Sequence, residues 1–372
     1  MYKLKNLLRH FIFIGLCGLF TPLVGLGQAN KNIGYYAQVK GSFLMAHRSA
    51  MSHLVKENAY GFEIGIIKHL QSSINDPQYR FPAIGLNLEY RNFGYDAVLG
   101  KALSMSHFYN LPFYQKKDFF IDFQFGTGIG YITKKFDLDN NLTNNAIGSH
   151  FNAKVTLKLL FTKYINRINF GGGLELSHYS NGAITYPNLG LNLPAVFVQI
   201  GFLPAGRKAF QKDGHYEEDV FKKYFKMKVL VSAIFSVKQV GANPYLPKRY
   251  PVFGVRGTFQ KKISKLWFAD FSVDVIQNEA NVHVYPYADY SQADALQIGL
   301  YVGAAYTFYK SEIVFGLGYY VRDKINPLGK VYNKIGYRYH LNSNWYGLFN
   351  VRANLGKADF FEFGIGYQLK KW

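Results

Sequence analysis

The sequence predicts an all-β protein, a transmembrane antiparallel β-barrel of about sixteen strands. Segments of about ten residues alternate between apolar and small or polar side chains, as in residues 361–369, and this period of two is typical of β-strands. Aromatic residues make up 18% of the chain, with 30 Tyr and 33 Phe, which favours strands over helices. Beyond the N-terminal segment, no apolar run reaches the roughly 18 residues that a membrane helix needs.

The strands are expected where this alternation recurs along the chain. Their number is even, as transmembrane barrels of bacteria require. We expect them at residues 33–46, 59–69, 82–92, 99–110, 117–132, 149–163, 166–180, 193–203, 225–239, 250–263, 266–277, 295–309, 312–323, 331–341, 345–355 and 359–370.

The strands fall into two halves, separated by a charged stretch without alternation. Residues 30–203 form one barrel half, residues 204–224 are expected to be a periplasmic linker, and residues 225–372 hold strands that complete or extend the barrel. An alternative arrangement is an eight-stranded barrel followed by a second β-domain. The alternation alone leaves both arrangements open.

The N-terminal segment, residues 1–29, predicts a secretory signal peptide. It has a basic start, an apolar run of about 16 residues and then small residues near the expected cleavage site. The one cysteine of the chain, Cys17, lies within it, so we expect neither disulfides nor thiol chemistry in the mature protein.

The charge of the chain indicates an anionic membrane surface as its partner. The formal net charge is +20, and an exported chain seldom meets nucleic acid, so lipopolysaccharide of the bacterial outer membrane is the expected partner and nucleic acid is not. No Gly-rich phosphate loop follows a strand, and we expect no cofactor. His47 and His53 lack a metal-ligand spacing and are interpreted as polar loop residues, so no metal is expected.

A possible base and nucleophile stand at the end of the seventh expected strand. If the chain starts in the periplasm, this strand runs outward and ends at His178–Ser180. Both residues share the parity of Leu174 and Leu176, which are expected to face lipid. Residues i and i+2 lie on one face of a strand, so the imidazole can reach the hydroxyl, the minimum for a serine nucleophile. The alternative is that His178 and Ser180 are rim residues among lipid headgroups.

The longer pattern resembles that of a known enzyme family. Residues 178–182 read HYSNG and residues 187–190 read PNLG. This resembles the signature of the outer-membrane lipid A 3-O-deacylase (acyloxyacyl hydrolase-like) family, which runs His-x-Ser-Asn and then Pro-Asn-x-Gly. The resemblance covers roughly residues 30–203 and is strongest at residues 178–190; it does not extend to residues 225–372. The family has an eight-stranded barrel with the motif between its last two strands.

The resemblance implies an esterase that removes an ester-linked acyl chain from lipid A. Ser180 would be the nucleophile and His178 the base. Asn181, Gly182 and Asn188 would contact the substrate or the oxyanion. For Asn181 and Gly182, turn formation is an equally good interpretation, because Asn-Gly is a favourable turn sequence.

One residue departs from the family pattern. The family places a glutamate two residues after the last glycine of the motif, where it orients the histidine, whereas this chain has Asn192. An asparagine oxygen can hold an imidazole tautomer but stabilises an imidazolium poorly. We expect Asn192 to orient His178, and we expect Glu175 to face the lumen on the other side of the wall.

Two classes of function follow from these patterns. The first is a lipid A deacylase embedded in the outer membrane. The second is a barrel without catalysis, a channel or an adhesin, because a single barrel of sixteen strands would be wide enough for a water-filled lumen. The sequence gives no oligomeric state.

Overall fold

The computed structural model describes residues 32–70, 82–206, 226–240, 248–264, 266–285, 287–308, 310–325, 327–354 and 357–371. The expected signal peptide, residues 1–29, lies outside these ranges, as does most of the expected linker at residues 204–224. In these ranges no helix has the length and hydropathy to cross a membrane.

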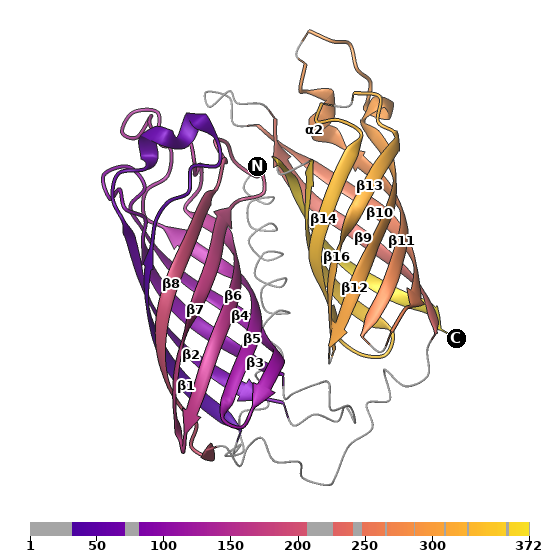
Figure 1. Ribbon diagram of the computed structural model, residues 1–372. Coiled ribbons are helices and arrows are strands. Elements are labelled where there is room, and N and C mark those ends of the chain that lie inside the picture. The colour runs from indigo at the N-terminus through magenta and orange to yellow at the C-terminus, as the bar shows by residue number, and fades with distance from the viewer. Residues whose placement is uncertain are drawn as a thin grey trace. The chain divides into compact units, whose positions relative to one another are not determined.

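The prediction of an all-β chain with sixteen strands is confirmed across the described residues, and the strands close into two barrels of eight, as in the alternative arrangement (Figure 1). Each strand pairs antiparallel with its neighbours along the chain, and the first and last strands of each set close the barrel. The first barrel comprises β1 (Ile33–Ser42), β2 (Ala59–His69), β3 (Ala83–Asn92), β4 (Lys101–Lys116), β5 (Phe119–Ile132), β6 (Phe151–Ile165), β7 (Ile168–Ser180) and β8 (Leu191–Phe202).

The second barrel forms a separate compact unit. It carries two short helices, α2 (Glu279–Val282) and η4 (Gln292–Ala295), between its third and fourth strands. Its strands are β9 (Met227–Gln239), β10 (Arg249–Lys262), β11 (Trp267–Asn278), β12 (Leu296–Phe308), β13 (Ser311–Arg322), β14 (Val331–His340), β15 (Trp345–Asn354) and β16 (Lys357–Lys371).

The alternation in the sequence becomes an apolar outer face and a polar lumen. On β7, the even-numbered Phe170, Leu174 and Leu176 are exposed, whereas the odd-numbered Glu175 and Ser177 are buried. A wall with this pattern is stable in a bilayer, because lipid solvates the apolar side chains and the backbone groups pair between strands.

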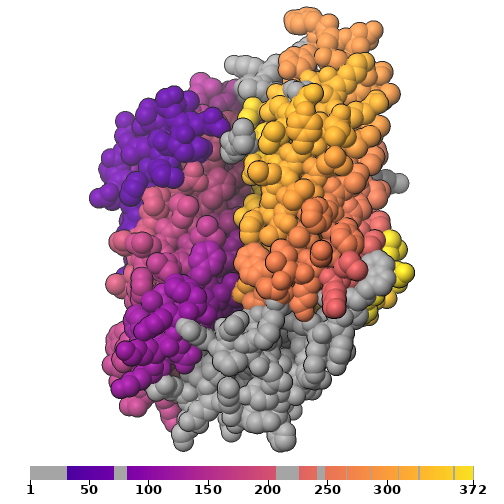
Figure 2. Space-filling view, turned by 45° about the vertical axis from the view of Figure 1, so that its right-hand side comes forward, coloured from indigo at the N-terminus to yellow at the C-terminus, as the bar shows by residue number. Residues whose placement is uncertain are grey.

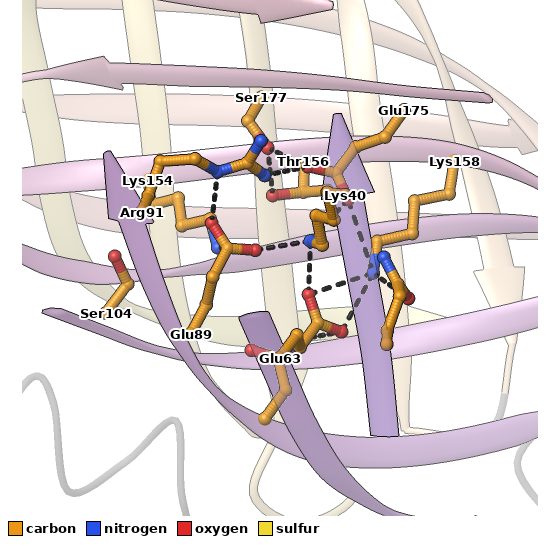
Figure 3. Close-up of polar contacts among 12 residues, drawn as sticks. Lys40, Glu63, Glu89, Arg91, Ser104, Lys154, Thr156, Lys158, Glu175 and Ser177 are labelled. Carbon is orange, nitrogen blue, oxygen red and sulfur yellow. Dashed lines mark hydrogen bonds and ion pairs between the residues drawn. The ribbon is translucent and has the colours of Figure 1, made fainter. Parts of the chain in front are cut away.

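The lumen of the first barrel is filled by a network of buried charges (Figure 3). The Lys40 Nζ lies 2.5 Å from a Glu63 oxygen and 2.6 Å from a Glu175 oxygen, and it also contacts Glu89. Arg91 bridges Glu89 and Glu175 at 2.9 and 2.5 Å. Lys154 and Lys158 contact the same carboxylates, so lysine and arginine side chains supply the positive charge that these three carboxylates would otherwise require from a metal ion.

The second barrel has an equivalent network built from other residues. Arg256 contacts Asp274 at 2.5 Å and Glu362 at 2.7 Å, and Arg352 contacts Glu362 at 2.7 Å. All four side chains are buried. Charged side chains therefore span both lumens, and this arrangement does not fit the wide, water-filled lumen that a single sixteen-stranded barrel would have.

The end of the first barrel at which β7 ends, which is the outer end expected from the sequence, is covered by loops that share a hydrophobic core. The loop after β1 includes the 3₁₀ helix η2 (Ser49–Leu54), whose Met51 and Leu54 are fully buried. Its residues, drawn in indigo, gather at one end of the barrel (Figure 2). Because loops pack here as tightly as a domain core, they can hold side chains at fixed positions. The core consists of Leu44, Met51, Leu54, Ala59, Phe93, Val98, Leu99, Ala102, Ile132, Ala146, Ile147, Tyr179, Leu191 and Leu193.

Candidate active site

The candidate site lies where β7 ends and β8 begins. In the register of these strands, His178 stands directly opposite Asn192. Directly opposite residues of an antiparallel pair project on the same face with their Cβ atoms about 5 Å apart. The His178 Nδ1 accordingly lies 2.6 Å from the Asn192 Oδ1, within hydrogen-bonding distance.

Ser180 lies two residues beyond His178, at the last position of β7. Its side chain is engaged by Asn188, whose Nδ2 donates to the Ser180 Oγ at 3.0 Å. The Asn188 Oδ1 accepts from the backbone N–H of Asn181 at 2.9 Å and lies 3.3 Å from the Ser180 Oγ. Asn188 therefore ties the serine to the backbone that follows it.

Asn181 uses its side chain for structure. Its Nδ2 donates to the Ser149 Oγ at 3.0 Å, which links the end of β7 to the loop before β6. Gly182 follows with φ 61°, a left-handed conformation that glycine adopts without strain. These features agree with turn formation at Asn181 and Gly182, and they leave the Asn181 backbone N–H as the group that faces Asn188.

Gly190 allows the backbone to pass against the imidazole. It has φ 81°, and a Cβ at this position would lie 2.7 Å from the Cε1 and 3.3 Å from the Nε2 of His178. Its N–H donates to the Ala146 carbonyl at 3.0 Å. A side chain at this position would press against the nitrogen that a catalytic base uses. Gly190, the last glycine of the sequence pattern, therefore leaves the space that the His178 imidazole occupies.

His47 is a site neighbour that the sequence did not indicate. Its Nδ1 lies 2.9 Å from the Asn192 Nδ2, on the side of the amide away from His178. Residues 47 and 192 are far apart in the chain, and no spacing connects them. The only available signal was barrel closure, because pairing of the first and eighth strands brings the loop after β1 beside the start of β8.

Glu175 lies on the opposite side of the wall, as its parity predicted. Its carboxylate contacts Lys40 and Arg91 in the lumen, and it accepts a hydrogen bond from the Ser177 Oγ at 2.7 Å. It is therefore committed to the lumen network, and Asn192 is the residue that lies opposite His178.

The fold and the site together define a class of protein. A closed barrel with an apolar outer face is a protein of the bacterial outer membrane. Its polar cluster of His178, Ser180, Asn188 and Asn192 lies at the end of β7, where Ser180 is buried and the other three are half-buried. Such a position is suited to an enzyme whose substrate is itself a lipid.

Comparison with known families supports this class. The model of the lipid A 3-O-deacylase (PagL) family matches residues 61–200, and the model of the acyloxyacyl hydrolase C-terminal domain matches residues 225–372. These two matches place residues 61–200 with the lipid A 3-O-deacylase family, an ester hydrolase family of the outer membrane, and residues 225–372 with the acyloxyacyl hydrolase C-terminal domain. The second match also shows that the second barrel, to which the sequence resemblance did not extend, belongs to a described domain.

Solved structures and curated proteins add little to this assignment. The crystal structure of the outer membrane enzyme PagL is 16% identical over 45% of this chain and 97% of its own, with a TM-score of 0.31. A triple mutant of the Rhodopseudomonas blastica porin is 10% identical over 91% of this chain and 99% of its own, with a TM-score of 0.22. Scores this low carry no conclusion. No curated protein matches the chain.

Proposed function

We propose that the first barrel hydrolyses an ester-linked acyl chain of lipid A by a serine–histidine mechanism. The observation that carries the proposal is the arrangement at the end of β7. His178 and Ser180 are two residues apart and have the same parity on the strand, and the Asn192 Oδ1 lies 2.6 Å from the His178 Nδ1. Hydrogen bonding at Nδ1 places the imidazole proton there and leaves the Nε2 lone pair free to act as a base.

In the first half of the reaction, Ser180 attacks the ester carbonyl. Its Oγ bonds to the carbonyl carbon while its proton passes to the Nε2 of His178. The hydrogen bond that Asn188 donates to the Oγ favours this proton transfer, because a hydroxyl oxygen that accepts from an amide can direct its own hydrogen to the imidazole. When the ester bond breaks, the imidazolium returns the proton to the departing sugar alkoxide.

In the second half, water replaces the alcohol. His178 takes a proton from the water as its oxygen bonds to the acyl carbon, and the proton then goes to the Ser180 Oγ as the acyl–serine bond breaks. The products are a free fatty acid and the regenerated serine. The deacylated lipid A carries a new hydroxyl, which formed in the first half of the reaction when the sugar alkoxide took the proton from His178.

Asn188 and Asn181 are the proposed oxyanion donors. The Asn188 Nδ2 already lies 3.0 Å from the Ser180 Oγ, next to where the carbonyl oxygen must develop charge. The backbone N–H of Asn181 points to the same side and is satisfied by the Asn188 Oδ1 in the free site. Fixed donors of this kind are the largest single contribution in many acyl-transfer enzymes.

The test is to replace Ser180 with alanine and to measure fatty acid release from lipid A by mass spectrometry. Ser180→Ala is expected to abolish release while the barrel still assembles, which heat-modifiable migration in gels reports. Ser177→Ala is the matched control, because Ser177 lies on the same strand but faces the lumen, where it contacts Glu175. Release by Ser180→Ala at the wild-type rate would exclude Ser180 as the nucleophile.

A further inference from the structure

His47 comes to the candidate site through the closure of the first barrel. Pairing between β1 and β8 continues beyond the end of β1. The N–H of Phe43 donates to the Pro194 carbonyl at 3.4 Å, and the N–H of Met45 donates to the Asn192 carbonyl at 2.9 Å. The backbone of residue 45 is therefore anchored to residue 192, and His47 extends from a point two residues further along.

The loop that carries His47 is fixed on its other side as well. Met51 and Leu54 are buried in the core that covers the outer end of the barrel. The Asn145 Nδ2 donates to the Ala50 carbonyl at 2.5 Å. With both ends of the segment held, His47 is placed by packing and not by its own side-chain contacts alone.

The contact between His47 and Asn192 is a hydrogen bond in which the Asn192 amide nitrogen faces the His47 Nδ1. The amide nitrogen of Asn192 carries hydrogens and no lone pair to offer, so it is the donor. In the orientation that the structure shows, the His47 Nδ1 accepts and the imidazole hydrogen of His47 is on Nε2. A His47 held in this tautomer favours one of the two orientations of the Asn192 side-chain amide.

That orientation determines what His178 can do. With the Nδ2 turned toward His47, the Oδ1 of Asn192 faces the Nδ1 of His178 and accepts its hydrogen. If the amide were turned over, the Nδ2 would face His178 and require a lone pair at Nδ1. The hydrogen of the imidazole would then sit on Nε2, and His178 could not accept the serine proton.

We propose that His47 is a positioning residue that locks the Asn192 amide and thereby sets His178 in its base-competent tautomer. The proposal rests on the proposed function for its catalytic consequence. It also explains why an asparagine needs a partner that a glutamate does not. The two carboxylate oxygens are both acceptors, so a carboxylate has no wrong orientation, whereas an amide has one.

The kinetic test compares two histidines of the same loop. His47→Phe is expected to lower kcat about tenfold, the loss that corresponds to about 1.4 kcal/mol, with little change in KM. His53→Phe removes an exposed histidine of the same loop whose Nε2 faces the Thr143 carbonyl and not Asn192, and it is expected to keep the wild-type kcat. His47→Gln, which can still accept from the Asn192 Nδ2, is expected to restore most of the rate. Equal losses in the two Phe variants, or no rescue by Gln, would overturn the proposal.

A second comparison separates orientation of the amide from general damage to the loop. In an Asn192→Asp background there is no amide to orient, so adding His47→Phe is expected to change kcat less than about twofold, against about tenfold in the wild-type background. A tenfold loss in both backgrounds would show that His47 acts through something other than the amide, and would refute the proposal.

A spectroscopic readout decides the matter without relying on turnover. In ¹⁵N-histidine-labelled protein in detergent, the His178 signals, identified by their loss in His178→Gln, are expected to show the Nδ1–H tautomer. His47→Phe is expected to shift them toward a mixture of tautomers, and His53→Phe is not. An unchanged tautomer in His47→Phe would refute the positioning role even if deacylation were observed. If the wild-type protein released no fatty acid, the proposed function would fail, and this measurement would still decide the role of His47.

Discussion

Replacement of Asn192 with aspartate is predicted to raise kcat for deacylation. Asp has the same length as Asn, so a carboxylate oxygen takes the place of the Oδ1 that lies 2.6 Å from the His178 Nδ1. The imidazole becomes an imidazolium as Ser180 attacks, and a negative charge at this distance stabilises it, whereas the neutral amide does so only through its dipole.

The size of the gain follows from the separation of the charges. Two unit charges about 4 Å apart, roughly the distance between the centres of the two groups, attract by about 1 kcal/mol in water and about 4 kcal/mol at an effective dielectric constant near 20. These values correspond to a gain of about fivefold to about a thousandfold in kcat. The gain should stay below the factor of about 10⁴ that the analogous aspartate contributes in a serine protease. Part of that factor arises because replacing the aspartate with asparagine there puts the catalytic histidine in the wrong tautomer. Here the Asn192 Oδ1 already faces Nδ1.

The assay is the initial rate of fatty acid release from lipid A in mixed micelles, with equal amounts of folded protein judged by heat-modifiable migration. Asn58→Asp adds the same charge at an exposed position of the loop after β1 and is expected to leave kcat unchanged. Asn192→Glu, which restores the family residue with one more methylene, is also expected to raise kcat. If Asn192→Asp gave no increase and Asn192→Ala kept the full rate, Asn192 would have no part in orienting His178.

Three further predictions test the site and its support. Asn188→Ala is expected to lower kcat by about 10²–10³, the usual effect of losing one oxyanion donor, with little change in KM. Gly190→Ala is expected to lower kcat about 10²-fold by displacing His178, whereas Gly329→Ala, which has φ 97° and no close neighbour, carries the same backbone strain without the catalytic loss. Lys40→Met removes a cation that contacts all three buried carboxylates of the lumen network and leaves them with Arg91, Lys154 and Lys158. It is expected to reduce the free energy of unfolding by about 3–5 kcal/mol in urea titrations of the detergent-solubilised protein. Lys163→Met breaks an exposed pair and should cost less than about 1 kcal/mol; a similar loss in both variants would contradict the role of the lumen network.

Much of the strand structure could be predicted, because a membrane wall imposes a period of two on every strand. Parity alone placed Leu174 and Leu176 outside and Glu175 inside, and the structure has them there. The same rule put His178 on the outer side, opposite Asn192 across one outer loop. These relations are local, since they depend only on neighbouring strands and on the loop between them.

The closure of the barrels could not be predicted in this way. Every strand would show the same alternation in one barrel of sixteen or in two of eight. Closure depends on whether β8 pairs with β1 or continues to β9, and the residues that favour pairing with β1 are far apart in the chain. Lys40 on β1 contacts Glu175 on β7, 135 positions away. The same distance in sequence hid His47, whose place beside Asn192 exists only once the barrel has closed.

The lumen network and the candidate site are connected through the strand that they share. A slip of β7 by one residue would turn Glu175 and Ser177 toward lipid and His178 toward the lumen. The contacts of Glu175 with Lys40 and Arg91 oppose that slip, because the loss of either contact would leave a charge unpaired in an apolar medium. Register on the inner face therefore fixes the height and direction of the imidazole on the outer face. A wall one strand thick offers few neighbours to a residue on its apolar face, so the position of His178 depends on the opposite face of β7 and on the loops. Lumen charges supply the first of these constraints, and the packed loop that carries His47 supplies the second.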